Sequence, residues 1–81
     1  MLKVYGSMLC PDCVACRKAF DAAGVQYVYL DFADHLLNLK RFLKMRDNDP
    51  AFTEVRASGK IGIPCVLRED GSITLDWESC M

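Results

Sequence analysis

The first 31 residues alternate between strand and helix patterns in a way that leaves few possible folds. Residues 2–5 and 26–31 are short runs rich in aromatic and β-branched side chains, which is typical of strands. Between them, apolar residues recur at helical spacing from Pro11, which suits a first helical turn, to Gly24, which suits a helix end. A crossover of this length makes the two strands parallel and is almost always right-handed. The sequence therefore predicts a β-α-β unit at the start of an α/β domain.

The middle of the chain predicts two more helices. A helix from Asp34 to about Arg46 is marked by an apolar stripe of three leucines, Leu36, Leu39 and Leu43. Its solvated face is expected to carry three charged residues, Lys40, Lys44 and Arg46. A polar break at residues 47–49 precedes a short helix, which Asp49 caps and Gly59 closes.

The last third of the chain predicts an antiparallel hairpin. Residues 63–67 and 72–75 are strand-type runs, and the Asp70-Gly71 pair between them is typical of a tight turn. The full order is β-α-β-α-α-β-β with a four-stranded mixed sheet, and residues 77–81 allow at most one turn of a truncated C-terminal helix. All 81 residues should form one domain, because a chain this short has no room for a second core.

Charge and hydropathy exclude two classes of partner. Ten basic and eleven acidic residues give a formal charge of -1, and no basic block offers the stripe that nucleic acid binding needs. No apolar run approaches the roughly 20 residues that span a bilayer, and the chain starts with a strand pattern rather than a signal peptide. We therefore expect a cytoplasmic protein that binds neither nucleic acid nor membrane. We also expect it to be a monomer.

Three of the five cysteines crowd into residues 10–16. An odd number of cysteines without a secretion signal is unlike a secreted disulfide scaffold. A bridge between Cys10 and Cys13 would close a very short loop and stabilise the fold little. This pair therefore indicates redox chemistry.

The Cys10-Pro11-Asp12-Cys13 segment follows the first strand and opens the first helix. The free N–H groups and dipole of a helix N-terminus favour a thiolate on Cys10, so this residue is predicted to be the nucleophile. Cys13 lies one turn further in, where it is shielded and can attack a mixed disulfide at Cys10. Pro11 restricts the loop, whereas the charge of Asp12 opposes the effect of the dipole.

These features together resemble the glutaredoxin family over nearly the whole chain. The matching segments are Val4-Tyr5-Gly6, the dithiol at residues 10–13, Ile63-Pro64 and the hairpin glycine Gly71. The resemblance implies a thioredoxin fold in which the dithiol faces a cis Ile63-Pro64 bond. It also implies that the Ile63 backbone binds a cysteinyl group of the substrate, with Gly62 allowing close approach.

The function implied by the resemblance is that of an enzyme, a thiol-disulfide oxidoreductase in cell redox homeostasis. Cys10 and Cys13 would reduce protein or small disulfides, and substrate would contact Pro11, Asp12, Gly62, Ile63 and Pro64. No bound metal or cofactor is expected, and electrons would come from glutathione or a thioredoxin-reductase-type donor. Ser7 stands where many glutaredoxins have a lysine that holds glutathione, so we expect weak coupling to glutathione.

Two alternatives use the same cysteines differently. A metal or iron-sulfur protein could take ligands from Cys10, Cys13, Cys16 and Cys65, although the spacing is an incomplete cluster motif. A non-catalytic thioredoxin-fold interaction module is the other. Periodicity favours burial of Cys16 and Cys65 in the core. Cys80 is expected to be exposed near the C-terminus, and Trp77 to anchor the tail.

Overall fold

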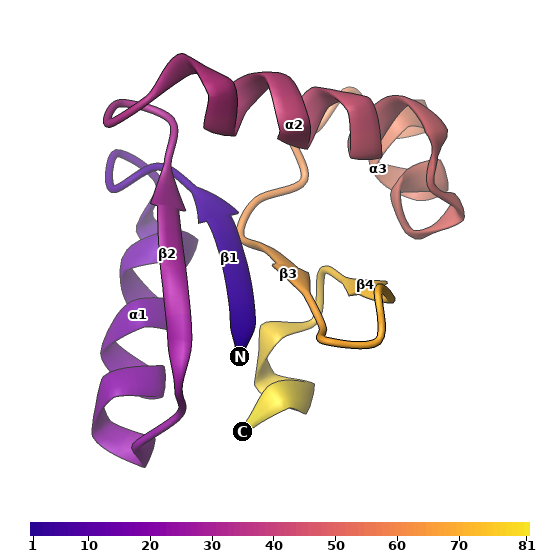
Figure 1. Ribbon diagram of the computed structural model, residues 1–81. Helices are drawn as coiled ribbons and strands as arrows, with labels where there is room; N and C mark the ends of the chain where they lie inside the picture. Colours follow the sequence, from indigo (N-terminus) through magenta and orange to yellow (C-terminus); the bar gives the residue numbers. More distant parts are fainter.

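The computed structural model describes residues 1–81 as one sheet with helices on both faces (Figure 1). Strands β1 (Leu2–Gly6), β2 (Tyr27–Asp31), β3 (Cys65–Leu67) and β4 (Ile73–Thr74) lie in the order β2-β1-β3-β4. β1 pairs parallel with β2 and antiparallel with β3, and β3 pairs antiparallel with β4. The predicted four-stranded mixed sheet is confirmed.

Five helical segments connect or follow these strands. They are α1 (Pro11–Ala23), α2 (Leu36–Asn48), the 3-10 turn η1 (Pro50–Phe52), α3 (Thr53–Ser58) and the 3-10 turn η2 (Trp77–Cys80). α1 begins at Pro11 and ends at Gly24, which takes the left-handed conformation with φ 71°. A side chain would be strained at this φ, so the glycine stops the helix as predicted.

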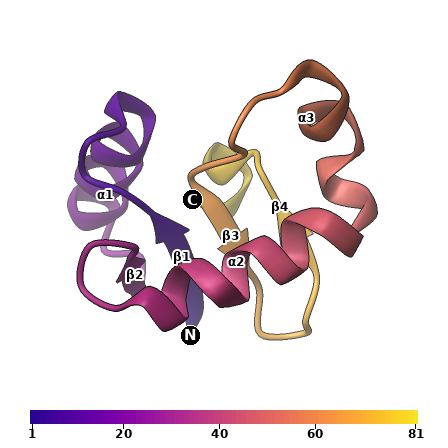
Figure 2. The same cartoon turned by 90° about the horizontal axis from the view of Figure 1, so that it is seen from above.

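The sheet separates two apolar clusters, because successive side chains of a strand point to opposite faces. One cluster joins α1 to the sheet and consists of Val4, Cys16, Phe20 and Val66. The other joins α2 and η1 to the sheet and consists of Tyr5, Phe42, Phe52 and Cys65. Figure 2 shows α1 and α2 on opposite sides of the strands. We refer to these sides as the α1 face and the α2 face.

The predicted leucine stripe of α2 is partly wrong. Phe42 is the fully buried residue of this helix, with Leu39 and Met45 packed around it, whereas Leu36 is 78% exposed and Leu43 is 43% exposed. The residues at 39, 42 and 45 follow one another by three positions, so they also share a face. The sheet selects this face because it buries a phenylalanine ring.

The boundaries of α2 also differ from the prediction. The helix starts at Leu36 because His35, outside the helix, caps it by accepting a hydrogen bond at Nδ1 from the Leu37 N–H at 3.1 Å. It continues through Asn48, whose side-chain amide donates to the Lys44 carbonyl at 2.7 Å. The polar break therefore shortens to Asp49, which caps η1 through its side chain.

The C-terminal part contains a second correction. β3 begins at Cys65 rather than residue 63, since Pro64 has no N–H to donate to a strand partner. Cys80 is half-buried and packs with Trp77 against the α1 cluster, so the expectation of an exposed thiol was wrong. Trp77 anchors the tail as predicted, with its ring centroid 6.0 Å from that of Phe20 in an edge-to-face arrangement.

No helix of the protein combines the length and the apolar character that crossing a membrane requires.

Candidate active site around Cys10

Cys10 stands at the N-cap of α1, as the sequence predicts. The turn from β1 is held by Ser7, whose carbonyl accepts from the Cys10 N–H at 3.0 Å and whose Oγ accepts from the Leu9 N–H at 3.2 Å. The Cys10 side chain makes no capping hydrogen bond, and its sulfur is half-buried and reduced. An unused sulfur beside the free N–H groups of a helix is available as a nucleophile.

Cys13 lies one helical turn further along and is fully buried. Burial, together with the smaller effect of the neighbouring Cys10, raises the pKa of its thiol to about 11. The Ser7 backbone N–H acts in the opposite direction by hydrogen bonding to the sulfur. Cys13 is therefore a neutral thiol near pH 7.

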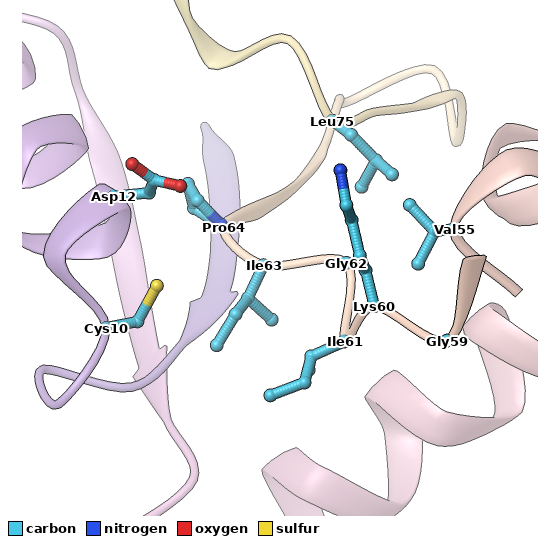
Figure 3. Close-up of a pocket in the computed structure, with 10 residues that line it drawn as sticks. All are labelled: Cys10, Asp12, Val55, Gly59, Lys60, Ile61, Gly62, Ile63, Pro64 and Leu75. Atoms are coloured by element: carbon cyan, nitrogen blue, oxygen red, sulfur yellow. The ribbon is translucent and has the colours of Figure 1, made fainter.

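A groove of about 390 Å³ opens beside Cys10 (Figure 3). Its walls are formed by Cys10, Asp12, Val55, Gly59, Lys60, Ile61, Gly62, Ile63, Pro64 and Leu75. Cys10 lies at the N-cap of α1 and Asp12 in its first turn, and the loop ending at Pro64 forms the opposite wall. The Ile63–Pro64 peptide bond is cis, as the family resemblance implied. Of the predicted site residues, Pro11 and Cys13 do not line this groove.

The structure requires a glycine at position 62 for a reason other than ligand access. Its φ is 93°, a conformation that disfavours side chains, and an added Cβ would lie 3.0 Å from ring carbons of Phe52. Val55 Cγ1 would be 3.1 Å away. The glycine thus lets the loop bend closely over η1 and α3.

Arg46 fixes the same loop from the side. Its guanidinium donates to the Ile61 carbonyl at 2.8 Å and to the Lys60 carbonyl at 2.5 Å. Arg56 in turn donates to the Arg46 carbonyl at 2.5 Å and to the Asp49 carbonyl at 2.9 Å. Arg46 was predicted to lie on the solvated face of α2; it is half-buried there, and its guanidinium binds carbonyls 14 and 15 residues later in the chain.

Sequence reasoning also missed Tyr29. This residue pairs with Val4 across β1 and β2 and packs on the α1 face, where its hydroxyl is buried beside Cys13. The alternation of Tyr27 and Tyr29 in β2 was a signal for one shared face. It did not reveal which atoms the two hydroxyls meet.

The cysteines considered as metal ligands do not converge. Cys16 belongs to the cluster on the α1 face and Cys65 to the cluster on the α2 face. Both are fully buried, as predicted, and burial raises the pKa of each thiol to about 12. No group of three or more His, Cys, Asp or Glu side chains is placed to hold a metal ion.

Comparison with known proteins identifies a relative but no described family. No model of a protein family matches the chain, and no solved structure matches it. A Haemophilus influenzae protein described as uncharacterized is 36% identical over 67 residues, which are 83% of this chain and 78% of the relative. The chain therefore belongs to one family with this Haemophilus influenzae protein.

Proposed function

We propose that the protein is a glutaredoxin-like thiol-disulfide oxidoreductase with a thioredoxin fold, acting through Cys10 and Cys13. The observation that carries the proposal is the sulfur of Cys10 at the N-cap of α1, facing the loop of Ile63 and Pro64 across the groove. The buried thiol of Cys13 directly behind it supplies the second sulfur that dithiol exchange needs.

In the first step, the Cys10 thiolate attacks a substrate disulfide. A bond forms between Cys10 and one substrate sulfur, the substrate S–S bond breaks, and the second substrate sulfur leaves as a thiolate that takes a proton. The N-terminal N–H groups of α1 favour the attacking charge. Ile61, which is 60% exposed, and the cation of Lys60 lie in the groove wall and are available to contact a substrate.

In the second step, the Cys13 sulfur attacks Cys10 and releases the reduced substrate. The bond between Cys10 and the substrate breaks, a bond between Cys10 and Cys13 forms, and the proton of Cys13 ends on the released thiol. Two electrons from glutathione or a thioredoxin-reductase-type donor then regenerate both thiols. We expect weak use of glutathione, because Ser7 is engaged in the turn and supplies no positive charge.

The proposed location is the cytoplasm, where thiols are kept reduced. The proposed partners are disulfide-containing proteins or small disulfides and one electron donor, with the protein acting as a monomer.

Cysteine substitutions test the proposal in a disulfide reduction assay with each donor in turn. Cys10→Ser should abolish turnover, and Cys13→Ser should accumulate a mixed disulfide that mass spectrometry detects. Cys80→Ser is the matched control and should keep activity, because its thiol lies away from the groove. Reduction of protein disulfides by Cys13→Ser at the wild-type rate would falsify the dithiol mechanism.

A further inference from the structure

The hydroxyl of Tyr29 is the one buried side-chain polar atom without a hydrogen-bond partner of good geometry. Buried hydroxyls almost always find a partner, because leaving one unpaired costs stability. An unpaired buried hydroxyl needs an explanation, and a hydrogen bond that it makes only during a reaction is one.

The sulfur of Cys13 is a neighbour of this hydroxyl. A Cβ added at Gly6 would lie 2.7 Å from Cys13 Sγ and 2.9 Å from the Tyr29 hydroxyl oxygen. Both atoms therefore lie within 2.9 Å of one point above the Gly6 backbone. Gly6 has no positive φ, so its missing side chain matters here for space. Any larger residue would displace the sulfur, the hydroxyl or both.

The ring of Tyr29 is held so that its hydroxyl stays at this position. β2 fixes the backbone through the pairing of Tyr29 with Val4, and the ring packs against the cluster on the α1 face. The guanidinium of Arg17 lies over the ring, 4.5 Å from its centroid. The hydroxyl is thus preorganised beneath the dithiol.

We propose that Tyr29 is a catalytic residue that donates a hydrogen bond to Cys13 Sγ as this sulfur becomes a thiolate in the resolving step. The inference rests on the proposed function and adds a third group to its mechanism. Tyr29 keeps its proton throughout. The Cys13 proton ends on the released substrate thiol, while the Cys10–substrate bond breaks and the Cys10–Cys13 bond forms.

The electrostatic surroundings agree with a hydroxyl that donates. Burial, and then the charge of Cys13, raise the pKa of Tyr29 above its ordinary value, so the phenol stays protonated. In return, the Tyr29 hydroxyl lowers the pKa of the Cys13 thiol against the effect of burial. The other titratable or charged groups that act on the pair are Cys10, Cys16 and Arg17 of α1 and Asp31 of β2.

A single-turnover reaction with an aromatic disulfide that releases a coloured thiolate separates the two steps. Attack by Cys10 releases a first thiolate, and attack by Cys13 on the mixed disulfide releases a second. In a Cys80→Ser background, Tyr29→Phe should leave the first release unchanged. It should slow the second about tenfold near pH 7 and raise the apparent pKa of that phase by about one unit.

Tyr27→Phe is the matched control. It removes a hydroxyl from the same strand and face, but this hydroxyl donates to Asp21 Oδ1 at 2.6 Å. The second release should keep its wild-type rate and pH profile. Because Tyr29→Phe keeps the ring and deletes an unpaired hydroxyl, its thermal unfolding midpoint should equal or exceed that of the wild type.

The outcomes separate this inference from the proposed function. If the first release is normal and Tyr29→Phe matches the wild type in the second, the role of Tyr29 is overturned while the dithiol mechanism stands. Equal slowing by Tyr27→Phe and Tyr29→Phe would show a packing effect and also overturn it. If Cys10→Ser leaves the first release unchanged, the proposed function itself fails.

Discussion

The two faces of the sheet are covered by different kinds of side chain. The α1 face combines buried Cys13 and Cys16 with the polar-tipped Tyr27 and Tyr29 and the guanidinium of Arg17. The α2 face is a cluster of phenylalanines in tilted and edge-to-face contact, in which the ring centroid of Phe42 lies 5.1 Å from that of Phe32 and 5.7 Å from that of Phe52. The α1 face thus places the hydroxyl of Tyr29 beside the sulfur of Cys13, whereas the sulfur of Cys65 on the α2 face is buried in a cluster of aromatic rings.

The groove lies where these two structures meet. Cys10 comes from the helix of the α1 face, whereas the loop of residues 59–64 rests on Phe52 and Val55 and is tied to Arg46 of α2. The difference teaches that Cys10 and the loop facing it across the groove depend on separate cores. Substitutions in the α2 face should change stability and binding, and those in the α1 face should change sulfur chemistry.

The largest effect is expected for the support itself. Phe42→Ala should lower the free energy of unfolding by about 3–5 kcal/mol, because it leaves a cavity in a fully packed cluster. Urea unfolding measures this loss, and Leu36→Ala on the exposed side of the same helix should change it by less than about 0.5 kcal/mol. Equal losses in both variants would contradict the assignment of the buried side of α2.

A smaller effect is expected where the α1 face meets β1. Gly6→Ala should lower the free energy of unfolding by about 1–3 kcal/mol, because its Cβ would overlap Cys13 Sγ and the Tyr29 hydroxyl. The double variant Gly6→Ala/Tyr29→Phe removes one of the two clashes and should recover part of this loss in urea unfolding. No recovery would mean that the hydroxyl does not share this space.

Arg46→Met should separate binding from chemistry. Loss of two charged hydrogen bonds loosens the loop, so we expect a KM for disulfide substrate raised about fivefold with little change in kcat, and about 1–2 kcal/mol less stability. Steady-state kinetics and urea unfolding measure these. Lys44→Met is the control on the same helix. A lowered kcat with unchanged KM would show that the loop acts on the sulfurs instead.

The smallest effect is expected in the pH dependence of stability, to which each face contributes one buried thiol. Burial raises the pKa of Cys16 and Cys65 to about 12, so the unfolded chain ionises first as the pH rises above about 9. The contribution of these thiols to the free energy of unfolding is fully present below about pH 9 and is lost as the pH rises towards about 12. A variant that lacks one of these thiols should therefore lose about 1 kcal/mol less unfolding free energy at pH 10 than the wild type does.

The test uses two variants, Cys16→Ala and Cys65→Ala. In each of them, the free energy of unfolding should fall less between pH 8 and pH 10 than it does in the wild type. Unfolding in urea at both pH values measures it. A pH dependence identical to that of the wild type in both variants would rule out buried thiols as its source.

Sequence reasoning succeeded where a short stretch of chain decides the backbone. Pro11 and Gly24 bound α1, and the Asp70-Gly71 turn joins two strands, because φ preferences and capping act over a few residues. The placement of Cys10 at a helix N-terminus follows from the same local signals. The burial of Cys13 was predicted from helical spacing instead, since Cys13, Cys16 and Phe20 recur on one side of the helix and all three are buried.

The tertiary structure alone decided which groups from distant segments meet. Leu39, Phe42 and Leu43 are all apolar, and only contact with the sheet selects which of them is buried. Arg46 binds carbonyls of the groove loop, and Tyr29 meets Cys13 over Gly6, across separations that no local preference spans. The sequence by itself therefore predicts the β-α-β unit and the dithiol. The side chains that surround the dithiol are determined by tertiary packing, because packing sums many weak contacts over the whole chain.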